Sequence, residues 1–200
     1  GAAGDGTEFG REVVAVEHEA DAVRFCDLVR TCLEEFALSL HPETTRLIEC
    51  GRHAAADREK RGLGKPETFS FLGFTFICSK TRQGRFLIKR KTRQDRMMAK
   101  LLELKGEMQR QMHWPISEQG KWLKRVVTGF FNYHAVPTNS RALAAFRHHV
   151  IALWRRTLRR RSQKDDTTWN RIARLAEEWL PKPRILHPWP SVRFAVKHSR

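Results

Sequence analysis

The sequence predicts an α+β fold in which a small antiparallel β part is followed by a mainly helical part. Two observations support this prediction. Phenylalanines alternate with other residues from Phe69 to Phe76, and a second alternating run starts at Phe86, which is typical of β-strands. After Thr92 the apolar residues instead recur at three- and four-residue steps to near position 180, which is typical of amphipathic helices.

The first part of the chain predicts a strand, a helix and a pair of strands. Residues 13–16 are rich in valine and predict a short strand. Apolar side chains form one stripe over residues 20–36, which predicts a helix, and residues 38–48 predict two extended pieces around Pro42. Residues 51–66 are glycine-rich and charged, so we expect a loop there.

The phenylalanine-rich segment predicts a bent hairpin or a bulged strand. Gly73 interrupts the alternation of phenylalanines between Phe71 and Phe74, as expected at a sharp turn or a bulge. A further strand follows the turn at residues 81–84, and its alternation places Phe86 and Ile88 on the inward face.

Four helices are expected after Thr92. The first covers residues 97–112 and ends before Pro115, and the second begins at Ser117 and ends before Pro137. Asn139 or Ser140 is expected to cap the third. Thr167 or Thr168 is expected to start the fourth, and residues 181–190, with four prolines, predict an extended tail that lies on another element. Four tryptophans lie on apolar stripes and are expected in the core: Trp122, Trp154, Trp169 and Trp179. Trp114 and Trp189 stay open as candidates for base stacking.

The net charge of +16 is divided very unevenly along the chain. Residues 1–50 carry a net charge of −7, and residues 51–200 carry a net charge of +23. Such a field attracts a polyanion, and nucleic acid is the expected partner, ahead of an acidic substrate or a membrane surface. A solvated helix face is the alternative for the basic runs.

Other classes of protein and site are not favoured by the sequence. No uncharged apolar stretch is long enough for a membrane span and residues 1–10 lack a signal-peptide pattern, so a cytoplasmic location without membrane contact is expected. The four cysteines are spaced too irregularly for a zinc site and are expected to be buried thiols. We therefore expect no metal site, and the oligomeric state stays open.

Five segments resemble the C-terminal half of group II intron reverse transcriptase/maturases. They are LHPETTRLIECGR (40–52), GKPETFSFLGFTFI (64–77), GRFLIKRKT (84–92), WLKRVVTGFFNYHAVPTN (122–139) and WRRTLRRRSQ (154–163). The resemblance implies that residues 13–91 are the C-terminal part of a reverse transcriptase palm, a small antiparallel β remnant. It implies that residues 92–180 form a helical thumb and maturase-specific domain, followed by a proline-rich basic tail at 181–200; residues 1–12 stay unmatched.

The resemblance also implies roles for individual residues. Phe71, Leu72, Gly73 and Phe74 are similar to the primer grip, the hairpin that positions a primer terminus. Basic residues near the palm-to-thumb junction and in the maturase helices are expected to bind intron RNA. Together with the charge density, this gives Lys89, Arg90, Lys91, Arg93, Arg96, Lys100, Lys124, Arg125, Arg155, Arg156, Arg159, Arg160, Arg161 and Lys164 as the RNA-binding candidates.

The catalytic carboxylates of the family are missing. The metal-binding YADD turn would fall on residues 8–11, which read Glu-Phe-Gly-Arg, and family members usually have lysine where this chain has Thr44. Asp165 and Asp166 lie between two predicted helices, where capping is the expected role. We therefore expect no catalytic residue and no cofactor in this chain, since Mg²⁺ belongs to a full-length polymerase relative.

The leading hypothesis is a maturase fragment that binds structured intron RNA and assists its splicing. One alternative is a part of an RNA-directed DNA polymerase whose fingers and metal-binding palm lie upstream, in which case a primer–template duplex is a further partner. Another alternative is a degenerate copy without function.

Overall fold

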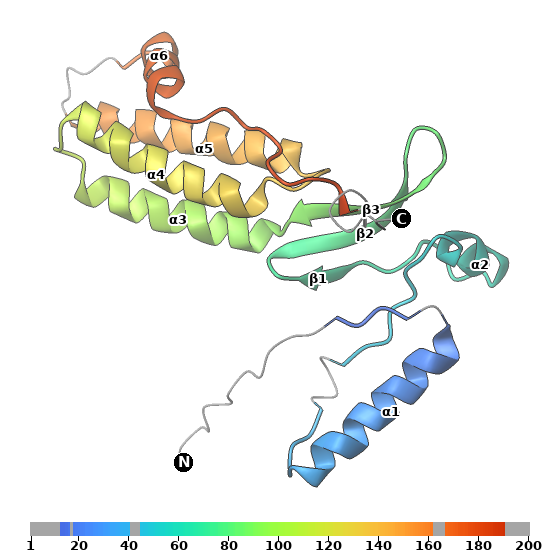
Figure 1. Cartoon of the computed structure of the whole chain (residues 1–200). Helices are drawn as coiled ribbons and strands as arrows, with labels where there is room; N and C mark the ends of the chain where they lie inside the picture. Colours follow the sequence, from blue (N-terminus) through green and yellow to red (C-terminus); the bar gives the residue numbers. More distant parts are fainter. Residues whose placement is uncertain (1–12, 17, 41–44, 162–166, 191–200) are drawn as a thin grey trace, which may run out of the picture.

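A computed structural model describes residues 13–16, 18–40, 45–161 and 167–190. Within these residues the chain forms six helices and one sheet of three antiparallel strands, so the predicted α+β class is confirmed. Figure 1 shows the helices that follow the sheet gathered at one end, the sheet beside them, and helix α1 (Glu19–Glu35) away from this group.

The sheet has the strand order β1-β2-β3, with strands Phe69–Phe71, Phe74–Lys80 and Phe86–Thr92. Leu72 and Gly73 connect the first two strands with φ values of 46° and 74°, the left-handed conformations that a two-residue hairpin turn requires. The predicted hairpin is thus confirmed. The inward placement of Ile88 is wrong: this side chain is 40% exposed, because the β2–β3 hairpin extends away from the helices at that end (Figure 1).

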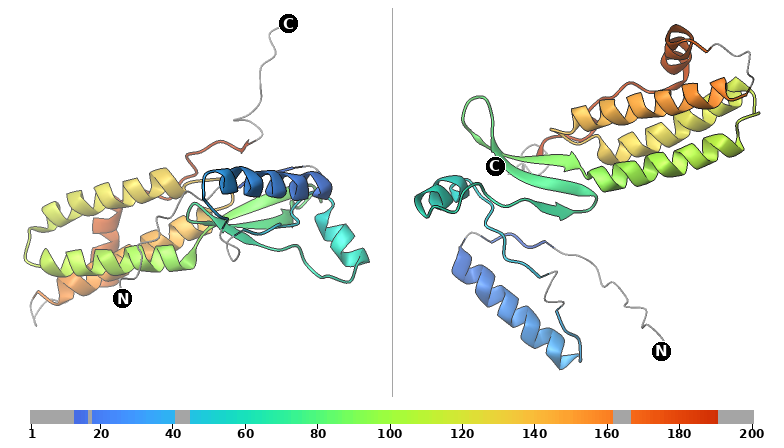
Figure 2. Two further views of the ribbon diagram at one scale, coloured as in Figure 1. Left: turned by 90° about the horizontal axis from the view of Figure 1, so that it is seen from below. Right: turned by 180° about the vertical axis from the view of Figure 1, so that it is seen from behind.

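The four helices expected after Thr92 are all present. They are α3 (Gln94–Arg110), α4 (Ile116–His134), α5 (Ser140–Arg159) and α6 (Trp169–Trp179). Figure 2 shows α3, α4 and α5 from two further sides as a bundle, with α6 crossing at the end away from the sheet. The core between them includes the fully buried side chains Leu104, Leu123, Val127, Leu143, Phe146, Val150, Trp154, Leu158 and Ile172.

The helix starts agree only in part with the predicted caps. Thr168 caps α6 as expected, because its Oγ1 accepts a hydrogen bond from the Arg171 backbone N–H at 3.3 Å. Helix α4 begins at Ile116, directly after Pro115, so Ser117 lies within its first turn and is not the cap. Asn139 occupies the cap position of α5, but its side chain makes no capping bond.

A buried polar pair fixes the bundle at the α3–α4 turn. The amide nitrogen of Gln119, a residue 4% exposed, donates to the carbonyl oxygens of Gln111 and Met112 at 2.8 and 3.1 Å. The Gln119 amide oxygen accepts from the indole N–H of Trp154 at 2.8 Å. These bonds add partners to two carbonyls at the end of α3, where the Gln111 oxygen also accepts from the Trp114 N–H, and they connect the turn to α5.

The N-terminal part of the chain differs most from the prediction. Helix α1 (Glu19–Glu35) is confirmed, but residues 13–16, 38–40 and 45–50 form no strands, and the predicted loop contains helix α2 (Ala54–Lys60). A strand needs a hydrogen-bonded neighbour, and within the described residues no other segment pairs with these. Three alanines and the ion pairs of Glu49 with Arg58 and Arg61 favour the helix α2.

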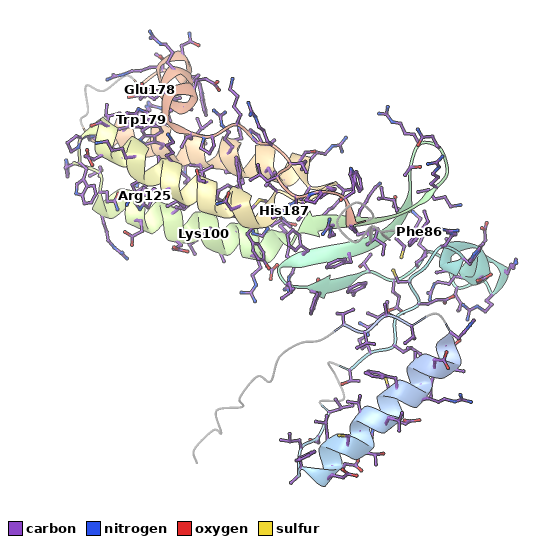
Figure 3. The ribbon with its side chains drawn as sticks, viewed as in Figure 1. Phe86, Lys100, Arg125, Glu178, Trp179 and His187 are labelled. Carbon is purple, nitrogen blue, oxygen red and sulfur yellow. The ribbon has the colours of Figure 1, made fainter. Side chains whose placement is uncertain are left out.

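The described part of the tail, residues 181–190, lies on the bundle as predicted. The backbone N–H groups of Leu186 and His187 both donate to the Ala135 carbonyl oxygen, at 2.9 and 3.1 Å. The His187 Nε2 lies 2.7 Å from the Asn132 carbonyl oxygen, at the end of α4 (Figure 3). None of the helices in the described ranges combines the length and apolar character that a membrane span requires.

Candidate nucleic-acid interface

The sheet and the bundle are joined by one buried asparagine. Asn139, 1% exposed, accepts from the Thr92 backbone N–H at 3.0 Å and donates to Thr92 Oγ1 at 2.7 Å and to the His134 carbonyl at 2.8 Å. The neighbouring Thr138 hydroxyl accepts from the Arg90 N–H at 2.9 Å and lies 3.2 Å from its carbonyl oxygen. The α4–α5 loop therefore holds the end of β3 in place, and with it the start of α3.

A groove with basic walls lies between α3 and α4, next to this junction. It has a volume of about 440 Å³, and Arg96 and Lys100 from α3 face Arg125 from α4 across it. Figure 3 shows Lys100 and Arg125 on these adjacent helices. Lys100 pairs with Glu103 at 2.8 Å, whereas Arg96 and Arg125 form no ion pair with any described residue. Two guanidinium groups are thus available to an anion in the groove.

The β1–β2 turn is attached near the sheet end of the groove. The Tyr133 hydroxyl donates to the Leu72 carbonyl oxygen at 2.8 Å, and the Gly73 carbonyl accepts from the Arg93 N–H at 2.9 Å. Phe74 is 7% exposed and its ring lies 5.7 Å from the Tyr133 ring. Leu72 is 63% exposed. Of the four residues predicted to resemble a primer grip, Phe74 thus belongs to the packing between sheet and helix, while Leu72 is presented to solvent.

His134 lines the groove as a neutral group. Burial against Phe130 and Phe74, whose ring centroids lie 4.2 and 5.2 Å away, lowers the pKa of His134 from 6.5 to about 4. The positive potential of the groove at neutral pH therefore comes from its lysine and arginine side chains.

The basic run on β3 is divided between the two faces of the sheet. Lys89 and Lys91 share one face and Arg90 lies on the other, because side chains alternate along a strand. Arg93 makes two bonds to the carboxylate of Asp95, at 3.0 and 2.6 Å, which hold the pKa of Asp95 below its usual value. The residues predicted to act as one basic cluster thus do not form a single surface.

The arginine run at the end of α5 has two kinds of members. Arg155 donates to the Thr167 carbonyl at 3.0 Å, and Arg161 donates to the Trp114 carbonyl, so both support the fold. Arg156, Arg159 and Arg160 are exposed and pair with no acidic side chain in the part of the chain that the structure describes. We call these three the α5 arginine patch. Lys164 and the adjacent Asp165 and Asp166 lie outside the described residues.

Lys124 faces a different hollow from its neighbour Arg125. This second hollow, of about 530 Å³, lies between α4, α6 and the tail, and Figure 3 labels Glu178 and Trp179 of its wall. Glu177 on its wall pairs with Arg147 and Lys182, both at 2.9 Å, and these cations hold the pKa of Glu177 below its usual value. The mixed charge makes this hollow a weaker anion site than the groove.

Two predictions about side-chain burial are wrong. Trp169, expected in the core, is 50% exposed, because it lies in the first turn of α6, beside the exposed end of α5. The cysteines are free, but none is fully buried and Cys32 is exposed. Within the described residues no three histidine, cysteine or acidic side chains gather closely enough to hold a metal ion.

Sequence reasoning missed two groove residues and one arginine that supports the fold. Tyr133 and His134 were not singled out, although their place in the motif before Asn139 is the signal that could have found them. Arg147 of α5 donates to the Ala176 carbonyl near the end of α6 at 3.0 Å, and no pattern in the sequence indicates this contact.

The fold and the interface define the chain as an α+β protein with a basic groove at the joint between a small sheet and a helical bundle. Comparison with known proteins adds no family: the chain matches no protein-family model, and no curated protein or solved structure gives a match.

Proposed function

We propose that this chain binds structured RNA through phosphate contacts, as the C-terminal part of a group II intron reverse transcriptase/maturase that assists intron splicing. The observation that carries the proposal is the groove in which Arg96 and Lys100 face Arg125, with two guanidiniums that lack acidic partners among the described residues. Guanidinium groups bind phosphate oxygens through two parallel hydrogen bonds, which suits them to RNA backbones.

The α5 arginine patch supplies a second contact. Three exposed arginines within five residues repel one another, and an anion would relieve that repulsion. The groove and the patch lie on the same bundle, since α4 packs against α5 through the shared core (Figure 2). An RNA with two helical segments could contact both.

The family part of the proposal is supported by the five sequence segments and by their order along the chain. The turn at Leu72 is tied to α4 by the Tyr133 hydroxyl, next to the basic groove. This neighbourhood suits a hairpin that contacts the end of a nucleic-acid strand. In this proposal the chemistry of splicing belongs to the RNA, and the chain supplies binding energy.

The test is RNA binding by a groove variant, Arg96→Gln/Lys100→Gln/Arg125→Gln. We expect the slope of log affinity against log salt to fall by about 0.7–0.9 for each phosphate that the variant no longer neutralises. The matched control, Arg24→Gln/Arg30→Gln/Lys60→Gln, removes three exposed cations from α1 and α2 and should leave the slope unchanged. Equal slopes for the groove variant and the wild type would contradict the assignment.

A second function, in primer–template handling within a polymerase, is favoured by the same turn beside the groove. It predicts that the chain binds a DNA–RNA hybrid with a recessed end more tightly than a blunt one. Magnesium-dependent primer extension by these 200 residues alone would show that the chain itself is an enzyme, contrary to the proposal.

A further inference from the structure

An exposed stack of side chains joins α5 to the start of α6. The Arg155 guanidinium carbon lies 4.6 Å from the centre of the Trp169 ring, and the His148 ring lies nearly parallel to the indole, at 6.4 Å and 8°. Trp169 is 50% exposed, and His148 is also exposed. The stack is thus a planar surface at the outside of the bundle.

The indole contacts two side chains of α5. His148 and Arg155 are seven residues apart, so they lie on the same side of that helix. The Arg155 guanidinium lies over the indole ring, and the His148 ring is nearly parallel to it. The arginine also donates to the Thr167 carbonyl at 3.0 Å, so it holds the indole against α5.

The two rings together offer an aromatic surface for one base. The planes of the indole and the imidazole differ by only 8°, their centres are 6.4 Å apart, and both side chains are exposed to solvent. An indole and an imidazole are both surfaces on which bases stack, and stacking on aromatic side chains is how proteins bind unpaired nucleotides.

We propose that Trp169 and His148 bind one unpaired base of an RNA strand, stacked on their exposed ring surfaces. Arg159 follows Arg155 by four residues and lies on the same side of α5, where it can contact the phosphate next to that base. This inference rests on the proposed RNA binding and names what the α5 end recognises: a single-stranded nucleotide beside a paired segment.

The experiment uses a single-stranded oligouridine that contains one 2-aminopurine, whose fluorescence falls when the base stacks. We expect the wild-type chain to quench this fluorescence. Trp169→Ala and His148→Ala should each reduce the quenching and weaken binding of this strand by about 5- to 100-fold. Binding of a fully paired RNA duplex should change less than about twofold, because a duplex offers no unpaired base.

The controls separate this inference from the proposal on which it rests. Phe36→Ala removes an exposed aromatic ring, 69% exposed, at the end of α1 and should leave quenching unchanged. His148→Ala removes an exposed ring, so its thermal unfolding should match the wild type even where Trp169→Ala loosens α6. If both variants bind and quench the strand like the wild type, or lose duplex affinity equally, the stacking site is refuted while RNA binding stands. If the wild type binds neither RNA, the proposed function itself fails.

Discussion

Removal of the α5 arginine patch should reduce the salt dependence of RNA binding by an amount that follows from its three charges. Arg156→Gln/Arg159→Gln/Arg160→Gln removes three exposed cations that pair with no acidic side chain in the described ranges, so the fold should be retained. If each arginine contacts one phosphate, the slope of log affinity against log salt falls by about 2.1–2.7, from 0.7–0.9 per contact. Between 50 and 200 mM salt, the affinity of the wild type should then fall about 20- to 40-fold more than that of the variant.

The assay is fluorescence anisotropy of a labelled stem–loop RNA, titrated at several KCl concentrations. The control is again Arg24→Gln/Arg30→Gln/Lys60→Gln, which lowers the net charge of +16 by the same three units. A patch variant whose slope equals that of the control would refute the reasoning, since it would show that only net charge matters. Thermal unfolding of both variants confirms that each is folded.

Three further predictions concern contacts that stabilise the bundle and its joint with the sheet. Gly120→Ala places a Cβ 2.5 Å from the Trp179 ring, so a loss of about 1–2 kcal/mol is expected in urea unfolding, despite the better helix propensity of alanine. Asn139→Ala leaves buried partners on Thr92 and His134 unsatisfied and should cost about 2–4 kcal/mol in the same assay. The pKa of His134 is lowered to about 4 in the folded chain, so the unfolded chain binds a proton first as pH falls below 6.5. Stability should therefore drop by about 1–2 kcal/mol between pH 7 and 5, and His134→Gln should reduce that drop.

Each of these predictions has a matched comparison. Gly129→Ala, on the same helix with open space around its Cβ, should be neutral or stabilising, and equal destabilisation by both alanines would contradict the steric argument. Asn170→Ala changes an exposed asparagine and should cost less than about 0.5 kcal/mol. For His134, a variant with the same pH dependence as the wild type would show that other groups account for the drop.

The helical half was predictable because its signals are local. Apolar residues at three- and four-residue steps, prolines at the ends and threonine before α6 each act within one turn of helix, and all four helices after Thr92 are present. The Leu72–Gly73 turn was predictable for the same reason, since alternating phenylalanines on both sides leave only these two residues to reverse the chain.

The extended pieces before residue 51 could not be predicted, because a strand depends on a neighbour that can lie far away in the sequence. The valines at 13–16 have strand propensity, but within the described residues nothing pairs with them. Helix α1 shows the same limit: the helix is correct, yet Phe25 and Phe36 of its apolar stripe are 41% and 69% exposed. Periodicity identifies an apolar face, and only tertiary structure decides whether that face is covered.

The sequence by itself determined that the chain is an α+β protein with a strongly basic second part, because propensity, periodicity and charge are properties of the residues alone. Tertiary structure decided how those charges are used. It brings Arg125 of α4 into the same groove as Arg96 of α3, whereas the adjacent Lys124 lines another hollow. Arg155 and Arg161 instead donate hydrogen bonds to backbone carbonyls. The physical reason is that salt screens an exposed charge beyond about 10 Å, and only folding sets which distant residues come within that range.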